Sequence, residues 1–430
     1  MITEEERELI DLIDGKELVE LTQKLIQIPS VPDEEAGTNE HEVAVFITNW
    51  IRENLGVQPI VEEVTPGREN VIATIDFEEG RGIGENLPTT GKTLMLEGHM
   101  DVVSAGDFTK WKHGPFSGVI EDGKIYGRGS CDMKAGLAVN LITAKALVEA
   151  ALSPDAKFRG NLRGKLRGKL RLGFVCDEEG MMIGIKDFIR KGYADDVDAC
   201  LVPEPEENQL CLTMKGAIRA IVRVTGKMAH GAMPLTGINP NTRMARIILA
   251  FEEYEQEEIK RCGKDEYVGY PSITFTVVQA PPKGTTAQLN VMPGEAEGYV
   301  DIRTTPCQNH DEIRKHLKEI LDNLASKDKD FKAEIEFIED RPVVTMTKDE
   351  PIAVLAADAY RDITGKEPIY NGVPGATDGT FLRAWKGIPS LVNGPGPRHI
   401  PHQYDEYVEI DELYEAAKIY LLTEYRYLAT

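Results

Sequence analysis

The sequence predicts an α/β fold with a mainly parallel sheet, interrupted by an inserted α+β domain of ferredoxin-like order. Between residues 93 and 202, short apolar stretches typical of buried strands alternate with good helix formers, which indicates parallel strands joined by right-handed crossovers. The order then becomes β-α-β-β-α-β, the ferredoxin-like arrangement. Helices and an apolar strand resume after Pro342, so the first domain is built from both ends of the chain. The expected bounds are 1–213 and 342–430 for the first domain and 214–341 for the insertion.

Hydrophobic spacing places the elements of the first domain. The first 55 residues have apolar residues at helical spacing on both sides of a loop with Pro29 and Pro32, which predicts helix, loop and helix. Glycines and prolines mark residues 80–90 as a surface turn. Strands are expected at 59–64, 70–75, 94–96, 170–176, 199–202 and 390–393, and helices at 137–152, 183–191, 352–363, 411–428 and from Asp378 onward.

The insertion has its own set of elements. Alternating apolar residues predict four strands, and amphipathic stretches predict two helices. Pro240 suits the start of the first helix, where its missing N–H costs nothing. The strands are expected at 217–225, 272–279, 295–302 and 332–338, and the helices at 241–258 and 311–324.

Composition excludes several classes of function. A net charge of -23 argues against nucleic acid or an anionic membrane as the main partner. No apolar run approaches the length that spans a bilayer, and the acidic N-terminus lacks the order of a secretion signal. The six cysteines contain no Cys-x-x-Cys spacing, so neither a disulfide framework nor a zinc knuckle is expected. We therefore expect a cytoplasmic protein.

One segment opposes the overall charge. Residues 157–171 carry six arginines and lysines beyond Lys157, with Leu-Arg-Gly-Lys written twice in tandem. The segment could bind an anion, but a solvated loop is the more common use of such basic runs, and we favour that interpretation.

The stretch from Thr93 to Ala151 carries the first candidate chemistry. His99 and Asp101 follow a predicted strand, and Asp132 lies in a Gly-rich turn that leads into a helix. In an open α/β sheet, ligands bind beyond the carboxyl ends of the strands. His99 and Asp132 could ligate a metal while Asp101 holds the other ring nitrogen of His99.

Three more polar motifs follow later strands. Adjacent carboxylates, Glu178 and Glu179, follow the strand at 170–176, and Glu204 follows the strand at 199–202. A histidine follows the last strand, in Arg-His399-Ile-Pro-His402-Gln-Tyr-Asp-Glu. Either histidine could ligate, and the Gln-x-x-Glu after His402 favours His402.

These motifs, together with Gly-Arg-Gly-Ser-Cys-Asp132-Met-Lys, resemble the dinuclear zinc amidohydrolases and peptidases that include acetylornithine deacetylase, succinyl-diaminopimelate desuccinylase, aminoacylase and glutamate carboxypeptidase. The resemblance covers nearly the whole chain. It implies a zinc-peptidase catalytic domain with an inserted lid or dimerisation domain. It also implies that His99 and Glu204 ligate one zinc, Glu179 and His402 the other, and Asp132 both, with Glu178 as general base and Asp101 as the partner of His99.

Charge balance agrees with that ligand set. Two Zn²⁺ ions per chain are neutralised by three ligand carboxylates and one bridging hydroxide, which leaves Glu178 free to take the proton of the bridging water. Co²⁺ or Mn²⁺ could fill the same ligands. Cys131 and Cys176 flank ligand positions, but we expect them to pack as small buried thiols.

The insertion contributes further candidates. The resemblance implies that His230 reaches the active site of a second subunit as an oxyanion donor, and hence a homodimer built through the insertions. It also implies that Asn290 and Arg303 hold a substrate carboxylate. Outside the insertion, it implies that Thr377 and Gly394 line the pocket. Without the resemblance, His230 could equally be a surface loop histidine, whereas for Arg303 a surface charge at a strand end is the less favoured alternative.

The predicted function is hydrolysis of the amide bond of an N-acyl amino acid, by a metal-bridging hydroxide with Glu178 as base. A dipeptidase or carboxypeptidase using the same site is the alternative, because the two differ only in the pocket. A catalytically silent binding protein is disfavoured, because Glu178 and all five ligand positions are present.

Overall fold

The computed structural model describes residues 1–33, 35–77, 91–152 and 165–429. They form two compact units. The first unit comprises Met1–Leu212, Met346–Asn371 and Thr377–Thr430, and the second comprises Thr213–Thr345 with Gly372–Ala376. The predicted turn at 80–90 and most of the basic segment lie outside the described residues.

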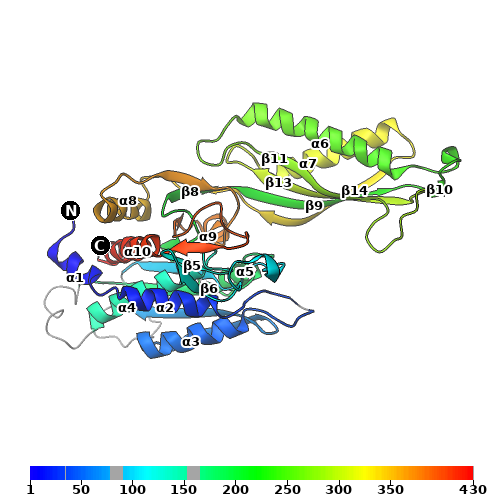
Figure 1. Ribbon diagram of the computed structural model, residues 1–430. Helices are drawn as coiled ribbons and strands as arrows, with labels where there is room; N and C mark the ends of the chain where they lie inside the picture. The colour runs from blue at the N-terminus through cyan, green and yellow to red at the C-terminus, as the bar shows by residue number, and fades with distance from the viewer. Residues whose placement is uncertain (34, 78–90, 153–164, 430) are drawn as a thin grey trace. The chain divides into compact units, whose positions relative to one another are not determined.

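The first unit is built on one large mixed sheet (Figure 1). Its strands follow the order β1-β2-β6-β3-β7-β17-β8-β15, and β16 also pairs with β8. The last two are β15 Val344–Thr345 and β16 Tyr370–Val373. The central strands β6, β3, β7 and β17 are parallel, whereas β1, β2 and β8 pair antiparallel at the flanks. The parallel centre agrees with the prediction, and the antiparallel flanks are an addition to it. The bounds are β1 Ile60–Thr65, β2 Arg68–Asp76, β3 Thr93–His99, β6 Lys169–Val175, β7 Ala199–Val202, β8 Leu210–Met214 and β17 Ser390–Val392.

Helices cover this sheet. The helix after the Gly-rich turn, α4 (Lys134–Leu152), is apolar around almost its whole circumference, and it packs against α2, α10 and β3. Such a helix must be buried, because no face of it suits water. The other helices of this unit are α1 Glu4–Ile10, α2 Gly15–Ile26, α3 His41–Leu55, α5 Ile183–Arg190, α8 Pro351–Thr364, α9 Gly379–Lys386 and α10 Ile410–Leu428.

A small antiparallel sheet was not predicted. Strand β5 (Lys124–Tyr126) lies between β4 (Val119–Glu121) and β18 (Tyr407–Glu409), so the segment after His402 pairs with the segment before Asp132. Three-residue strands have too little alternation to be recognised in a sequence.

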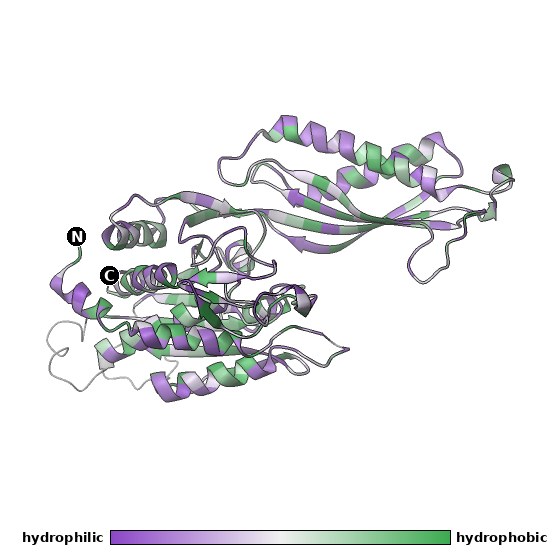
Figure 2. Cartoon of the chain, in the orientation of Figure 1, coloured by the Kyte–Doolittle hydropathy of each residue, from purple (hydrophilic) through white to green (hydrophobic). Residues whose placement is uncertain are grey.

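The second unit has the predicted ferredoxin-like topology. Its antiparallel sheet has the order β11-β13-β9-β14, and two helices pack against it. Figure 2 shows polar and apolar residues alternating along these strands, and the buried set of β13 faces Met244, Ile247 and Phe251 in one core. The bounds are β9 Gly216–Thr225, α6 Pro240–Cys262, β11 Ser272–Gln279, β13 Glu295–Thr304, α7 His310–Lys327 and β14 Lys332–Arg341.

The cysteine prediction was incomplete. Cys262, at the end of α6, forms a disulfide with Cys307 in the loop before α7. The two residues are 45 positions apart, and that spacing matches no recognisable motif, so their pairing depends on the tertiary fold. The four other cysteines are buried free thiols, as predicted for Cys131 and Cys176.

Among the residues described, no helix is both long and apolar enough to cross a bilayer.

Candidate metal centre

The parallel strands bring the candidate ligands of the first unit to one edge of the sheet. His99 is the last residue of β3, Glu178 and Glu179 follow β6, and Glu204 follows β7. Asp132 lies two residues before α4. Because parallel strands all end at the same edge, residues 105 positions apart in the chain become neighbours here.

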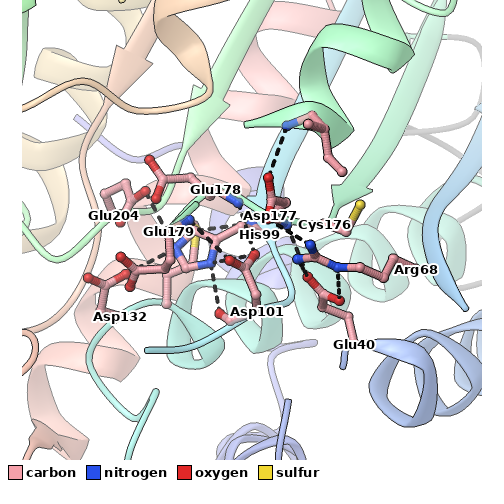
Figure 3. Close-up of polar contacts among 12 residues, drawn as sticks. Glu40, Arg68, His99, Asp101, Asp132, Cys176, Asp177, Glu178, Glu179 and Glu204 are labelled. Atoms are coloured by element: carbon pink, nitrogen blue, oxygen red, sulfur yellow. Dashed lines mark hydrogen bonds and ion pairs between the residues drawn. The ribbon is translucent and has the colours of Figure 1, made fainter. Parts of the chain in front are cut away.

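Asp132 lies between the two histidines. Its Oδ1 is 3.0 Å from His99 Nε2, and its Oδ2 is 3.4 Å from His402 Nε2. Glu204 Oε1 is 3.8 Å from His99 Nε2, and Glu179 Oε1 is 2.8 Å from His402 Nε2. The structure thus brings all five predicted ligands together, and Figure 3 shows the carboxylates converging on His99. His402 faces the cluster although its side chain is 51% exposed, and His399 is exposed as well.

Glu178 belongs to the same cluster. Its carboxylate lies with the imidazole of His99 and the carboxylate of Glu204 in a group whose ligand atoms are all within 4.8 Å of one another. His99, Asp132 and Glu179 form a second such group. Glu178 is 7% exposed, so surrounding protein atoms hold its side chain against the cluster.

The electrostatics reflect this concentration of carboxylates. Hydrogen bonds to Asp132 and Glu179 raise the pKa of His402 to about 10, against the opposing effect of burial. Burial opposes charge on His99 too, but hydrogen bonds to Asp101 and Asp132 raise its pKa well above the usual value. Burial and the charge of Asp132 raise the pKa of Glu204. The cluster therefore favours positive charge at its centre.

A pair of divalent cations fits these residues. Imidazole nitrogens and carboxylate oxygens are ligands that Zn²⁺, Co²⁺ and Mn²⁺ accept. Asp132 directs one oxygen toward each histidine, as a carboxylate shared by two ions would. Buried carboxylates in this number are costly unless they are paired or coordinate a metal.

Asp101 contacts both His99 and the acidic turn. His99 Nδ1 is 2.9 Å from the backbone oxygen of Asp101 and 3.6 Å from its carboxylate. The carboxylate oxygens also accept the backbone N–H groups of Glu178 and Glu179, at 3.1 and 3.0 Å. Asp101 thus lies against His99 with its main chain and its side chain, and the same side chain holds the acidic turn.

Glu406 was missed as a site residue. Its Oε1 accepts the N–H groups of Cys131 and Asp132 at 2.9 and 3.0 Å, and its Oε2 pairs with Arg128. The carboxyl is fully buried, and burial raises its pKa to about 7. The Gln-x-x-Glu pattern after His402 was the signal that could have found it.

Two predicted pocket residues, Thr377 and Gly394, lie in the first unit. The carbonyl of Gly394 accepts N–H groups from Glu206 and Asn208, at 3.1 and 2.9 Å. A Cβ on Gly394 would lie 2.4 Å from the backbone of Pro203, so only glycine permits this approach beside Glu204. Thr377 is buried.

The remaining candidates lie in the second unit. His230 is exposed on β10 (Ala229–His230), which pairs with β12 (Val291–Met292), and its Nδ1 accepts the N–H of Ala232 at 3.0 Å. The carbonyl of Asn290 accepts the N–H of Gly231 at 2.7 Å. Arg303 pairs with Asp301 through Nε at 2.6 Å and Nη2 at 3.2 Å.

Fold and site together define a metal-dependent hydrolase of amide bonds. The chain belongs to the peptidase family M20/M25/M40, whose family model matches residues 95–423, and this confirms the resemblance seen in the motifs. A relative from Staphylococcus aureus (strain MRSA252), named probable succinyl-diaminopimelate desuccinylase, is 27% identical over 96% of this chain and 98% of its own.

Solved structures share the fold. An M20 family metallo-carboxypeptidase from Sulfolobus solfataricus superposes with a TM-score of 0.76 at 20% identity, over 96% of this chain and 100% of the other. A dipeptidase from Saccharomyces cerevisiae has a TM-score of 0.74 at 18% identity, over 99% of both chains.

Proposed function

We propose that this protein hydrolyses the amide bond of an N-acyl amino acid, using two zinc ions held by His99, Asp132, Glu179, Glu204 and His402. The observation that carries the proposal is the place of Asp132 between the two imidazoles. Co²⁺ and Mn²⁺ are the alternative metals, because they accept the same donors.

Glu178 is the proposed general base. When bound, the divalent ions would lower the pKa of water and polarise the substrate carbonyl. Glu178 lies against the cluster without being needed as one of the five ligands. It takes the proton of the attacking water and later passes it to the leaving amine, a role that typically contributes about 10²–10⁴-fold in rate.

His230 is the proposed oxyanion donor. Its Nδ1 accepts a backbone N–H, so the neutral ring carries its proton on Nε2 and can donate there. The side chain is exposed in its own unit, which suits a group that acts on a second subunit. We therefore propose a homodimer in which the second unit, the lid or dimerisation domain, supplies His230 in trans.

Arg303 and Asn290 are proposed to bind the substrate carboxylate. A guanidinium pairs with carboxylates through its planar fork, and Nη1 of Arg303 takes no part in its two hydrogen bonds to Asp301. Thr377 and Gly394 are proposed to line the pocket. The succinyl-diaminopimelate desuccinylase name of the relative favours an N-acyl substrate, and a dipeptide is the second candidate because solved relatives include a dipeptidase.

A cytoplasmic location is part of the proposal. The acidic composition supports it, whereas the Cys262–Cys307 disulfide is a feature more common in oxidising compartments.

A substrate panel tests the reaction. The protein is loaded with Zn²⁺, Co²⁺ or Mn²⁺ and assayed with N-succinyl and N-acetyl amino acids beside dipeptides and their C-terminal amides. We expect the highest kcat/KM for an N-acyl amino acid with a free carboxylate. Faster turnover of dipeptides would select the second candidate, and no turnover of any amide would overturn both.

Complementation tests the trans role of His230. His230→Ala and Glu178→Gln are each expected to be inactive alone. A heterodimer obtained by co-expression with two different tags contains one intact site of two, so it is expected to regain about half of the parental activity if His230 acts across the dimer. An inactive heterodimer would overturn the assignment.

A further inference from the structure

The turn that carries Glu178 and Glu179 is held by two carboxylates from outside it. Asp101 accepts the N–H groups of Glu178 and Glu179, and Glu40 accepts the N–H of Asp177 at 3.1 Å. Three consecutive backbone donors thus have side-chain acceptors. Asp177 has a φ of +68°, in the left-handed region that is uncommon for residues other than glycine.

Arg68 joins the two acids behind this turn. Its Nε donates to Glu40 Oε2 at 2.8 Å, and its Nη1 lies 2.8 Å from Asp177 Oδ1. A third contact joins Nη2 to Glu40 Oε1, the oxygen that also accepts the N–H of Asp177. Figure 3 shows the guanidinium between the two carboxylates, on the far side of Asp177 from His99.

This arrangement is buried and comes from distant parts of the chain. The Glu40 side chain is 0% exposed, Asp177 is 10% and Arg68 is 19%. Glu40 precedes α3, Arg68 begins β2, and Asp177 follows β6. The same strand β2 also holds the turn through Asn70, whose Oδ1 accepts the N–H of Cys176 at 3.1 Å.

Removing Arg68 leaves the buried carboxylate of Glu40 without its cation. Burial raises the pKa of Glu40, while its hydrogen bond to Arg68 opposes that rise. Without Arg68, the buried charge of Glu40 is costly, so Glu40 is expected to take up a proton or to move. Either change alters the acceptor for the N–H of Asp177. The turn would then be free to shift at the residue next to Glu178.

We propose that Glu40 and Arg68 are positioning residues that fix the Asp177–Glu179 turn, so that Glu178 and Glu179 reach their places in the metal cluster. The inference rests on the proposed function, because it assumes that Glu178 and Glu179 act at that cluster. Neither residue touches substrate, and both act through the turn.

The test compares Arg68→Met with Arg426→Met. Arg426 is a matched control: it is 15% exposed and pairs with two acids, Glu6 at 2.7 Å and Asp362 at 2.6 Å, but it contacts no residue of the cluster. Both variants lose a half-buried arginine that bridges two carboxylates. A general loss of stability should therefore affect them alike.

Two readouts separate positioning from folding. At saturating metal and substrate, Arg68→Met is expected to lower kcat by about 10- to 100-fold, because a displacement of 1 Å can cost about 10²-fold. KM should change much less. In Co²⁺-substituted protein, the visible absorption of the metal should differ from that of the parent. Arg426→Met should change neither readout, and Arg68→Lys should recover part of kcat.

The outcomes are distinct. Unchanged kcat and an unchanged Co²⁺ spectrum in Arg68→Met, or equal changes in Arg426→Met, would overturn the inference. If Arg68→Met does not fold, Glu40→Gln is tested in its place. Glu40→Gln keeps the size of the side chain and one oxygen acceptor. If the parent cleaves no amide, the proposed function fails, and the Co²⁺ spectrum alone decides on the positioning role.

Discussion

Glu424 on α10 makes the stability of the protein depend on pH. Its carboxyl is fully buried; Oε1 accepts the hydroxyl of Thr143 at 2.8 Å, and Oε2 has no hydrogen-bond partner among the described residues. Burial raises its pKa to about 8, from an ordinary value of 4.5. The perturbation is Glu424→Gln, which keeps the shape and removes the ionisation.

The sign follows from proton binding. Between pH 4.5 and about 8, the folded state holds a proton on Glu424 that the unfolded state has lost. The free energy of unfolding therefore falls as pH rises through this window, by about 1.4 kcal/mol per pH unit. Over the whole window the loss reaches about 5 kcal/mol, an upper estimate that applies once both states are ionised.

Urea unfolding at pH 5, 6, 7 and 8 measures the effect. All three tryptophans, Trp50, Trp111 and Trp385, lie in the first unit, so their fluorescence follows the unit that contains Glu424. We expect the stability of Glu424→Gln relative to the parent to rise with pH by several kcal/mol. Glu415→Gln on the same helix is the control. A difference between Glu424→Gln and the parent that stays constant from pH 5 to 8 would refute the reasoning.

Three further predictions concern the site and the second unit. Glu178→Gln should retain its metals, measured by elemental analysis, yet lose about 10²–10⁴-fold in kcat; a nearly normal rate would exclude it as the base. Removal of metal by a chelator should lower the free energy of unfolding, by about 4 kcal/mol where the metal was present at 1,000 times its Kd, and added Zn²⁺ should restore it. An unaltered unfolding midpoint would contradict a bound metal. Cys307→Ser opens a bridge between residues 45 positions apart and should destabilise the second unit by up to about 4 kcal/mol. Reductant should cause the same loss of stability in the parent and leave the variant unaffected. If reductant also destabilises the variant, the loss does not originate in the disulfide.

Three of the five candidate ligands were predictable as neighbours because they lie at the ends of strands. His99, Glu179 and Glu204 come directly after apolar stretches, and the parallel order places the ends of those stretches together. Alternating apolar and polar residues predicted the four strands of the second unit, because burial of one face of a sheet imposes a period of two on the sequence.

The supporting contacts were not predictable. Glu40 and Arg68 are single charged residues whose neighbours in the chain do not mark them, and both act on a backbone segment far away in sequence. The side chain of Asp101 was assigned to His99, and its two further hydrogen bonds, from backbone N–H groups of the acidic turn, were not foreseen. Such contacts depend on the tertiary fold, so local pattern could not reveal them.

Strand β17 has a consequence for synthesis on the ribosome. It lies between β7 and β8, parallel to one and antiparallel to the other, although some 180 residues separate it from them in the chain. Translation at 5–20 residues per second needs about 10–40 s to supply it. Until then the nascent polypeptide exposes the edges of β7 and β8, whose unpaired backbone groups can pair with a strand of another chain. The second unit lies between these points in the chain, so it can emerge and fold while the larger sheet still awaits its middle strand.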